Sequence, residues 1–394
     1  MPIEEQLQEI HRLAVLGDVA AIAQDVGPRL TQVWLATSRF REVRALSLQT
    51  LALGPHARTL VDLARAQRRL GEVAEALDHY RTASSLYTEV GDRAGLATTL
   101  NNIGLVYDGL GDRQQALRYY QQALPIIEEV GDRAGLATTL NNIGLVYNGL
   151  GDRQQALDYY QQALPIIEEV GNRAGLAATL SNIGAVYNGL GDRQQALRYY
   201  QQALPIQEEV GDRAGLATTL NNIGLVYDGL GDRQQALRYY QQALPIQEEV
   251  GDRAGLATTL NNIGLVYNRL GDRQQALRYY QQALPIREEV SDRAGLAATL
   301  NNIGAVYNDL GDRQQALHYY QQALPIREEV GDREGESVTR YNMAMLYRVQ
   351  GQLAEAVAAL RQVVALDAQV QHPDLEADQA VLRQVEQEWR ESLQ

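Results

Sequence analysis

The feature that most restricts the fold is a repeat with a period of forty residues. "LNNIGLVY" spans residues 100–107 and returns at 140, 220 and 260, with the variants "LSNIGAVY" at 180 and "LNNIGAVY" at 300. A period of this length is typical of a solenoid, because one unit cannot bury its apolar face alone and must stack on its neighbours. Six near-identical units occupy residues 97–336, and diverged copies lie at 57–96 and 337–371.

Each unit predicts two antiparallel helices. The apolar face of the first helix contains Leu96, Leu100, Ile103, Gly104, Tyr107 and Leu110, which recur at the period of an α-helix. "LGD" then ends this helix, and Asp112 is placed to cap the second one. The second helix is expected to bury Ala116, Tyr120, Ala123 and Leu124 and to end near Gly131.

A proline recurs inside the second helix, at Pro125, Pro165, Pro205, Pro245, Pro285 and Pro325. Pro125 lies opposite the buried Ala116, so it is expected to face solvent and to bend the helix toward the core. The position two residues later reads Ile127, Ile167, Gln207, Gln247, Arg287 and Arg327. This variation predicts that the buried stripe shifts at the proline to Ile126 and Val130. The alternative is that the helix stops at Leu124 and a new one begins.

The unit resembles the tetratricopeptide repeat in the spacing of Leu100, Ile103, Gly104, Tyr107, Gly111, Ala116, Tyr120 and Ala123. The forty-residue variant is similar to the repeats of kinesin light chain, bacterial signalling ATPases and caspase-like (CHAT) proteases. The resemblance implies an all-α, right-handed superhelical solenoid over residues 57–371. Residues 1–56 are then expected to form a degenerate helical cap and residues 372–394 a terminal capping helix.

The resemblance also implies that one sector of the first helix lines a concave groove that binds a protein or peptide. Its positions read Asn101, Asn141, Ser181, Asn221, Asn261 and Asn301; Leu105, Leu145, Ala185, Leu225, Leu265 and Ala305; and Asp108, Asn148, Asn188, Asp228, Asn268 and Asn308. A ladder of asparagines is suited to hold an extended backbone, with leucine adding apolar contact. The alternative is that the asparagines bond to neighbouring helices. Basic character is expected only at exceptions such as Arg269, which favours a neutral or mildly basic internal segment as the partner.

Two positions of this sector change together. The third and sixth units carry Ala178 with Ala185 and Ala298 with Ala305, where the other four units carry threonine and leucine. We predict a pocket for a bulky apolar anchor at each of these alanine pairs. Duplication of a three-unit block is the alternative origin of the pattern.

Composition excludes several kinds of chemistry. The chain has no cysteine and no lysine, and its five histidines are scattered without ligand spacing, so no catalytic residue, metal or cofactor is expected. The formal charge of −14 disfavours nucleic acid, and no apolar run is long enough for a membrane span. We therefore expect a non-enzymatic, cytoplasmic, bacterial scaffold that binds a protein or peptide, of open oligomeric state. The alternative is a sensor or regulatory arm whose ATPase or protease lies on another chain.

Overall fold

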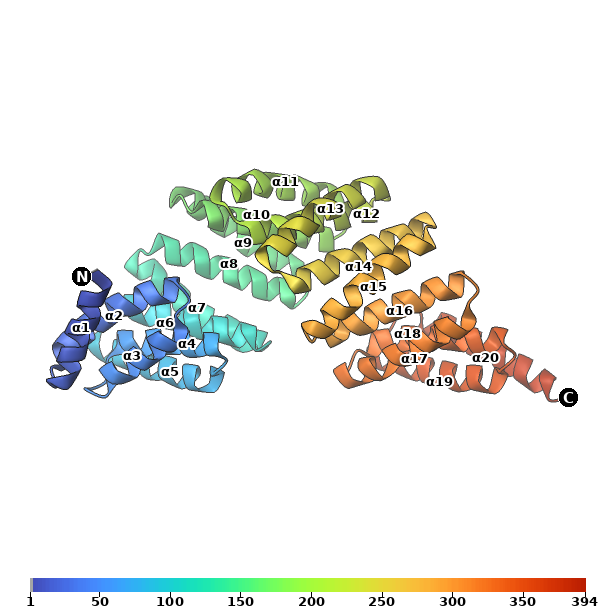
Figure 1. Cartoon of the computed structure of the whole chain (residues 1–394), viewed down its shortest axis with the longest axis horizontal. Helices are drawn as coiled ribbons and strands as arrows, with labels where there is room; N and C mark the ends of the chain where they lie inside the picture. The colour runs from blue at the N-terminus through green and yellow to red at the C-terminus, as the bar shows by residue number, and fades with distance from the viewer. Residues whose placement is uncertain (1–2) are drawn as a thin grey trace. The chain divides into compact units, whose positions relative to one another are not determined.

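The computed structural model describes residues 3–394, and this part of the chain is helical throughout, with turns between the helices (Figure 1). The chain divides into two compact units, residues 1–192 and residues 193–394, and each is described by itself. The first unit contains α1 (Ile3–Leu16), α2 (Ala20–Ala36), α3 (Phe40–Leu51), α4 (Ala57–Leu70), α5 (Val73–Val90), α6 (Arg93–Gly109), α7 (Arg113–Val130), α8 (Arg133–Gly149), α9 (Arg153–Glu169) and α10 (Arg173–Gly189). The second contains α11 (Arg193–Val210), α12 (Arg213–Gly229), α13 (Arg233–Val250), α14 (Arg253–Leu270), α15 (Arg273–Glu289), α16 (Arg293–Asp309), α17 (Arg313–Val330), α18 (Arg333–Val349), α19 (Leu353–Val370) and α20 (Leu375–Ser392).

Within each compact unit, the two helices of a repeat pack extensively against each other. α6 packs on α7, α8 on α9, and α12 on α13, and this contact is more extensive than the contact with the next pair. Close approach within a pair requires glycine: a Cβ atom at Gly104 would lie 2.6 Å from the ring of Tyr120. Beside this contact, Tyr107 and Tyr119 stack with ring centroids 5.5 Å apart. The predicted two-helix unit is confirmed.

The turns are built by aspartate and glycine, as the sequence predicts. Asp112 accepts a hydrogen bond from the backbone N–H of Gln115 at 3.1 Å, and Asp132 accepts one from Gly135 at 2.9 Å. Gly131 ends α7 with φ of 71°, a left-handed conformation that glycine adopts without strain. The position of Leu110 was predicted wrongly, because this side chain is 57% exposed in the turn that follows α6.

The second helix continues through its proline. α7 runs from Arg113 to Val130 with Pro125 inside it and exposed to solvent. The predicted shift of the buried stripe is correct for Ile126, which is buried, but wrong for its neighbours: Ile127 is only 3% exposed, whereas Val130 is 38% exposed. The equivalent polar side chains, Gln207, Gln247, Arg287 and Arg327, are also buried. The alternative, that the helix stops at Leu124, is wrong.

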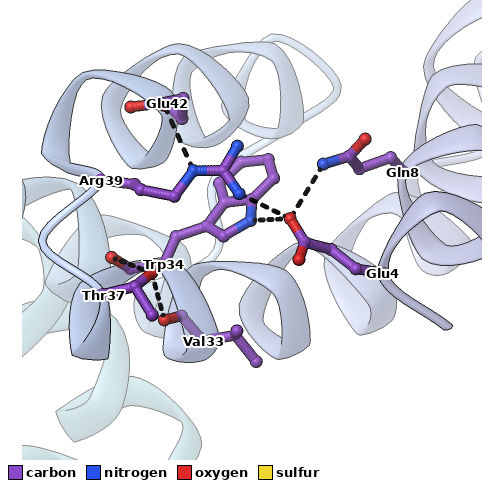
Figure 2. Close-up of polar contacts among 7 residues, drawn as sticks. All are labelled: Glu4, Gln8, Val33, Trp34, Thr37, Arg39 and Glu42. Carbon is purple, nitrogen blue, oxygen red and sulfur yellow. Dashed lines mark hydrogen bonds and ion pairs between the residues drawn. The ribbon is translucent and has the colours of Figure 1, made fainter. Parts of the chain in front are cut away.

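Residues 3–56 form three helices: α2 and α3 pack against α4, and α1 packs on α2. α1 is held by Glu4, whose carboxylate accepts hydrogen bonds from Trp34 Nε1 at 2.7 Å and from Arg39 Nη1 at 2.6 Å (Figure 2). The Arg39 guanidinium also lies over the Trp34 ring. Trp34 is therefore a packing residue of this end, as expected from the sequence.

At the other end, α20 packs on α19. Val385 is fully buried, and Trp389 packs against the same apolar cluster. Arg348 of α18 donates to Glu388, and Arg361 of α19 pairs with Glu386 at 2.8 Å. α20 is therefore fixed by both apolar packing and ion pairs.

Candidate functional site

The first helices of successive repeats lie beside one another. α6 contacts α8 and α8 contacts α10 in one compact unit, and α12, α14, α16 and α18 follow the same rule in the other. The second helices of successive repeats make no comparable contact in residues 3–394. Within each compact unit the first helices are therefore the more closely spaced layer. We call the outer surface of these first helices the first-helix face.

The asparagines of the first-helix face join successive repeats. Asn141 Oδ1 accepts from the Thr179 hydroxyl at 2.9 Å, and Asn221 Oδ1 accepts from Thr259 at 3.0 Å. The same bond joins Asn261 to Thr299 and Asn301 to Thr339, each at 3.2 Å, and Asn101 bonds to Thr139 through its amide nitrogen. The contact with a neighbouring helix, which the sequence left as an alternative, is thus present. Asn262 and Asn302 support the ladder by donating to Asn221 and Asn261.

Each of these asparagines uses only part of its amide. In Asn141, Asn221, Asn261 and Asn301 the oxygen is occupied by threonine, while Nδ2 has no hydrogen-bond partner in the described chain and is not buried. The amide therefore offers donors rather than acceptors on the first-helix face. Ser181, which replaces asparagine in the third repeat, is half-buried.

The neighbouring positions of the face differ in exposure. Leu145 and Leu225 are 39% and 42% exposed, and Leu105 and Leu265 are half-buried. Of the paired alanines, Ala178 is exposed and Ala185, Ala298 and Ala305 are half-buried.

The last column of the face is the least uniform. Asn148, Asn188 and Asn268 are half-buried, and Asn308 is exposed. Asp108 is half-buried, and this burial raises the pKa of its carboxyl group, an effect that Arg113 opposes. Asp228 was expected to be available to a partner, but it is buried and pairs with Arg269 of the next repeat. The same pairing uses Arg269, the one basic residue predicted for this face.

A second set of residues lies beneath the face and was missed at the sequence level. We call it the floor column; it occupies one position of every second helix and reads Tyr87, Ile127, Ile167, Gln207, Gln247, Arg287, Arg327 and Asp367, all buried. Arg287 shows the position of the column, because this side chain contacts residues of two consecutive first helices. Arg287 donates to Asp292, the capping residue of α16, and lies 3.4 Å from the Thr258 hydroxyl of α14.

The floor column is where the near-identical repeats differ most in chemistry. It changes from aromatic and aliphatic side chains to amides, then to guanidinium groups, and ends in a carboxylate. Arg287 and Arg327 each pair with the capping aspartate of the next first helix, Asp292 and Asp332. A buried charge needs such a partner, because its desolvation is costly.

Comparison with known proteins gives the family. The family model described as "Tetratricopeptide repeat" matches residues 55–129, 111–169, 135–209, 175–249, 215–289 and 295–369. The chain belongs to the tetratricopeptide repeat family. No curated protein matches its sequence.

Solved structures share the tetratricopeptide fold at low sequence identity. One is the signal transduction ATPase with numerous domains (STAND) from Pyrococcus horikoshii, which has a tetratricopeptide repeat sensor; identity is 14%, the TM-score is 0.68, and the match covers 92% of this chain and 55% of that one. The apo quorum sensor NprR from B. thuringiensis matches at 17% identity and a TM-score of 0.66, over 86% of this chain and 97% of that one. A Rap protein complexed with competence and sporulation factor matches at 16% identity and a TM-score of 0.59, over 94% and 99%. The present chain thus spans about half the length of the STAND protein.

The first tetratricopeptide repeat, at 57–96, differs from the others on its face. The positions equivalent to Thr98, Leu105 and Asp108 are Arg58, Arg65 and Arg68. Arg58, Arg65 and Tyr87 line a cavity of about 330 Å³ between α4 and α6, together with the buried Asp62. The sequence predicts basic residues on this face only at exceptions such as Arg269. That prediction is wrong for the first repeat, which carries three arginines on its face.

Two other kinds of feature, a metal-type cluster and a membrane-spanning helix, are absent from the described part of the array. In residues 3–394 there is no group of three or more histidine, aspartate or glutamate side chains arranged to hold a metal ion. None of the helices there combines the length and apolar character needed to cross a membrane.

Proposed function

We propose that this tetratricopeptide scaffold is non-enzymatic and binds an extended segment of a partner protein on its first-helix face. The observation that carries the proposal is the repeated pairing of an exposed or half-exposed leucine with an asparagine whose Nδ2 lacks a partner in the described chain, as at Leu225 and Asn221. Regularly spaced amide donors suit the backbone carbonyls of an extended segment, and leucine suits its apolar side chains.

The partner is expected to be a protein or peptide in the bacterial cytoplasm. The formal charge of −14 opposes the approach of a nucleic acid backbone and of an anionic membrane surface. The asparagine and alanine positions named above are the contacts proposed for binding, together with Leu105, Leu145, Leu225 and Leu265. Asp228 takes no part, because its carboxylate is buried in the pair with Arg269.

The test is an affinity capture with a matched surface control. The double variant Leu225→Glu and Leu265→Glu places two charges on the first-helix face without changing the buried core. Gln242→Glu places a charge on the exposed surface of a second helix. A partner that is captured from the host by the wild type and by Gln242→Glu, but lost by the double variant, supports the proposal. Equal capture by all three proteins contradicts it.

A second candidate function is a sensor arm for an effector on another chain. It is favoured by the fold similarity to the STAND protein, which covers 92% of the present chain. The same capture experiment separates the two functions: an ATPase or protease as the sole retained partner supports the sensor arm. A series of partners with a common segment supports the general scaffold.

A further inference from the structure

The last repeat departs from the charge pairing of the repeats before it. In the two preceding repeats the floor residue is arginine and the capping residue of the next first helix is aspartate, as in Arg327 with Asp332 at 2.5 Å. Forty residues further on, the floor residue is Asp367 and the position of the capping aspartate is His372. The buried charge is therefore reversed in sign at this place.

Asp367 has no cationic partner. It is only 1% exposed, and no ion pair joins it to a basic side chain in residues 3–394. Its Oδ1 accepts from the Ser337 hydroxyl at 2.6 Å, whereas Oδ2 is buried and has no hydrogen-bond donor in residues 3–394 other than the Asp378 carboxyl group in its protonated form. His372 does not supply the missing charge to this oxygen: its Nδ1 accepts from the backbone N–H of Asp374, at 3.2 Å.

A cavity of about 310 Å³ opens onto this carboxylate. Its walls come from α18, α19, α20 and the turn before α20, and the residues are Ser337, Val338, Tyr341, Asp367, His372, Asp374, Ala377 and Asp378. Val338 and Tyr341 occupy the positions of Thr98 and Asn101, so the cavity belongs to the first-helix face. It combines three carboxylates with an aromatic ring and aliphatic carbon.

The second carboxylate at this site makes the lack of a cation more costly. Burial, then the hydrogen bond and charge of Asp367, raise the pKa of Asp378 to about 6. Above that pH the ionised Asp378 faces Asp367 across the cavity. The other strongly buried carboxylates of this compact unit, Asp228 and Glu336, have arginine partners. A cation bound in the cavity would give Asp367 the positively charged partner that Asp228 and Glu336 already have.

We infer that this cavity is a binding site for one cationic side chain, an arginine or lysine, of the segment that occupies the first-helix face. The guanidinium or ammonium group would bind between Asp367 and Asp378, and the aliphatic stem would lie along Val338 and Tyr341. The inference rests on the proposed function for the source of the cation. The site itself is testable without knowing the partner.

The experiment uses N-acetyl-arginine amide as the probe and N-acetyl-norleucine amide as its uncharged counterpart. Binding is followed by the backbone amide NMR signals of Tyr341 and Ala377 in the full chain at pH 7.5. We expect the arginine probe to shift these NMR signals in a saturable way, and we expect the norleucine probe to cause no saturable shift. Equal shifts with both probes overturn the inference.

Asp367→Asn removes the charge and keeps the size and the acceptor for Ser337. It is expected to weaken binding of the arginine probe about tenfold or more, because a buried charge pair is lost. Its melting temperature should equal or exceed that of the wild type, since an unpaired buried charge is removed. Glu376→Gln changes the same charge on the exposed side of α20 and should bind as the wild type does.

Two further outcomes are decisive. Unchanged binding by Asp367→Asn overturns the inference, and if this variant does not fold, Asp378→Asn takes its place with the same expectation. Probe binding that depends on Asp367, together with equal partner capture by the face variants, supports the cation site while contradicting the proposed function. The reverse pattern contradicts only the cation site.

Discussion

Two glycines of α6 show how strongly the surroundings of a glycine determine the effect of replacing it with alanine. A Cβ atom at Gly104 would lie 2.6 Å from the ring of Tyr120, whereas a Cβ atom at Gly109 would meet nothing within 4 Å. We expect Gly104→Ala to destabilise the array by about 1–3 kcal/mol, because the buried ring must move. Gly109→Ala should stabilise it by up to about 1 kcal/mol through helix propensity. Urea unfolding followed by circular dichroism measures both, and a loss of stability in both variants would contradict this account.

The floor column makes a prediction at the same scale. Ile127→Ala should cost about 2–5 kcal/mol, because the side chain is 3% exposed and its removal leaves a cavity. Val130→Ala, three residues later on the exposed side of α7, should change stability by about 0.5 kcal/mol or less. Equal effects of the two changes would restore the interpretation that the buried stripe shifts at Pro125.

The helical repeat was predictable from short-range signals, whereas the floor column was not. Asp112, Gly131 and the spacing of Ala116 and Tyr120 act within one helix or one turn, so their roles can be deduced from the sequence. From the sequence alone, arginine at position 287 suggests an exposed side chain, because a buried arginine requires an acidic partner and the sequence does not show one. That partner is Asp292, which also caps α16 through the backbone N–H of Gly295. The second role of the capping aspartate depends on how the helices pack.

The positions of the first-helix face were predictable from the sequence, but the contacts between them were not. The positions of Asn221 and Leu225 follow from helical periodicity, but the Asn221–Thr259 bond joins residues of different repeats. The ion pair of Asp228 with Arg269 also crosses between repeats. Such contacts need the spacing between first helices, which the sequence of one repeat does not contain.

Among the secondary-structure elements, α20 has a packing that depends on pH. The pKa of Asp378 is raised from 3.8 to about 6, so its contribution is fully present below about pH 3.8 and is lost as the pH rises through about 6. The pKa of Glu388 is lowered from 4.5 by the hydrogen bond from Arg348, so its contribution is present above pH 4.5 and is lost at more acidic pH. α20 should therefore pack most firmly between about pH 4.5 and 6.

The fluorescence of Trp389 measures this behaviour, because its ring packs against the cluster that contains Val385. We expect a spectral change centred near pH 6 in the wild type, with the side chains of Asp367, His372 and Asp374 also facing the titrating group. Asp378→Asn should abolish the change. A transition that persists in this variant would assign it to another group.

The first helices with paired alanines give a prediction about binding. Ala305→Leu and Ala185→Leu add side-chain volume at half-buried positions of the first-helix face and leave the buried core unchanged. If these places accept apolar anchors, the double variant should bind the captured partner about tenfold or more weakly, with a melting temperature close to that of the wild type. Gln242→Leu, which places the same side chain on the exposed surface of a second helix, serves as the control. Unchanged affinity in the double variant would leave duplication as the whole explanation of the pattern.

At the scale of the whole molecule, a hydrogen bond between asparagine of one repeat and threonine of the next recurs along the array, and we call this set of bonds the Asn–Thr seam. Because the seam repeats, we predict that the array tolerates the removal or addition of whole repeats. Deletion of residues 297–336 removes one complete repeat and brings Thr339 to the place of Thr299, so that Asn261 regains the same kind of partner. We expect the mean helicity per residue to be unchanged, because each repeat contacts only its neighbours. Deletion of residues 313–332 removes only the second helix, α17, with the turn that follows it, and should cause loss of helicity or aggregation. Circular dichroism and size-exclusion chromatography distinguish these results.

The Asn–Thr seam also bears on how such a gene changes. Misaligned recombination between near-identical coding repeats adds or removes whole multiples of forty codons and keeps the reading frame. Most such products would inherit a complete seam at the new junction, since asparagine in one repeat meets threonine in the next wherever the exchange occurs. The floor column would be reshuffled by the same events, with each repeat carrying its own aliphatic, amide or guanidinium residue. A lineage of this protein could therefore change the order of the aliphatic, amide and guanidinium floor residues by rearranging existing repeats, before any point mutation.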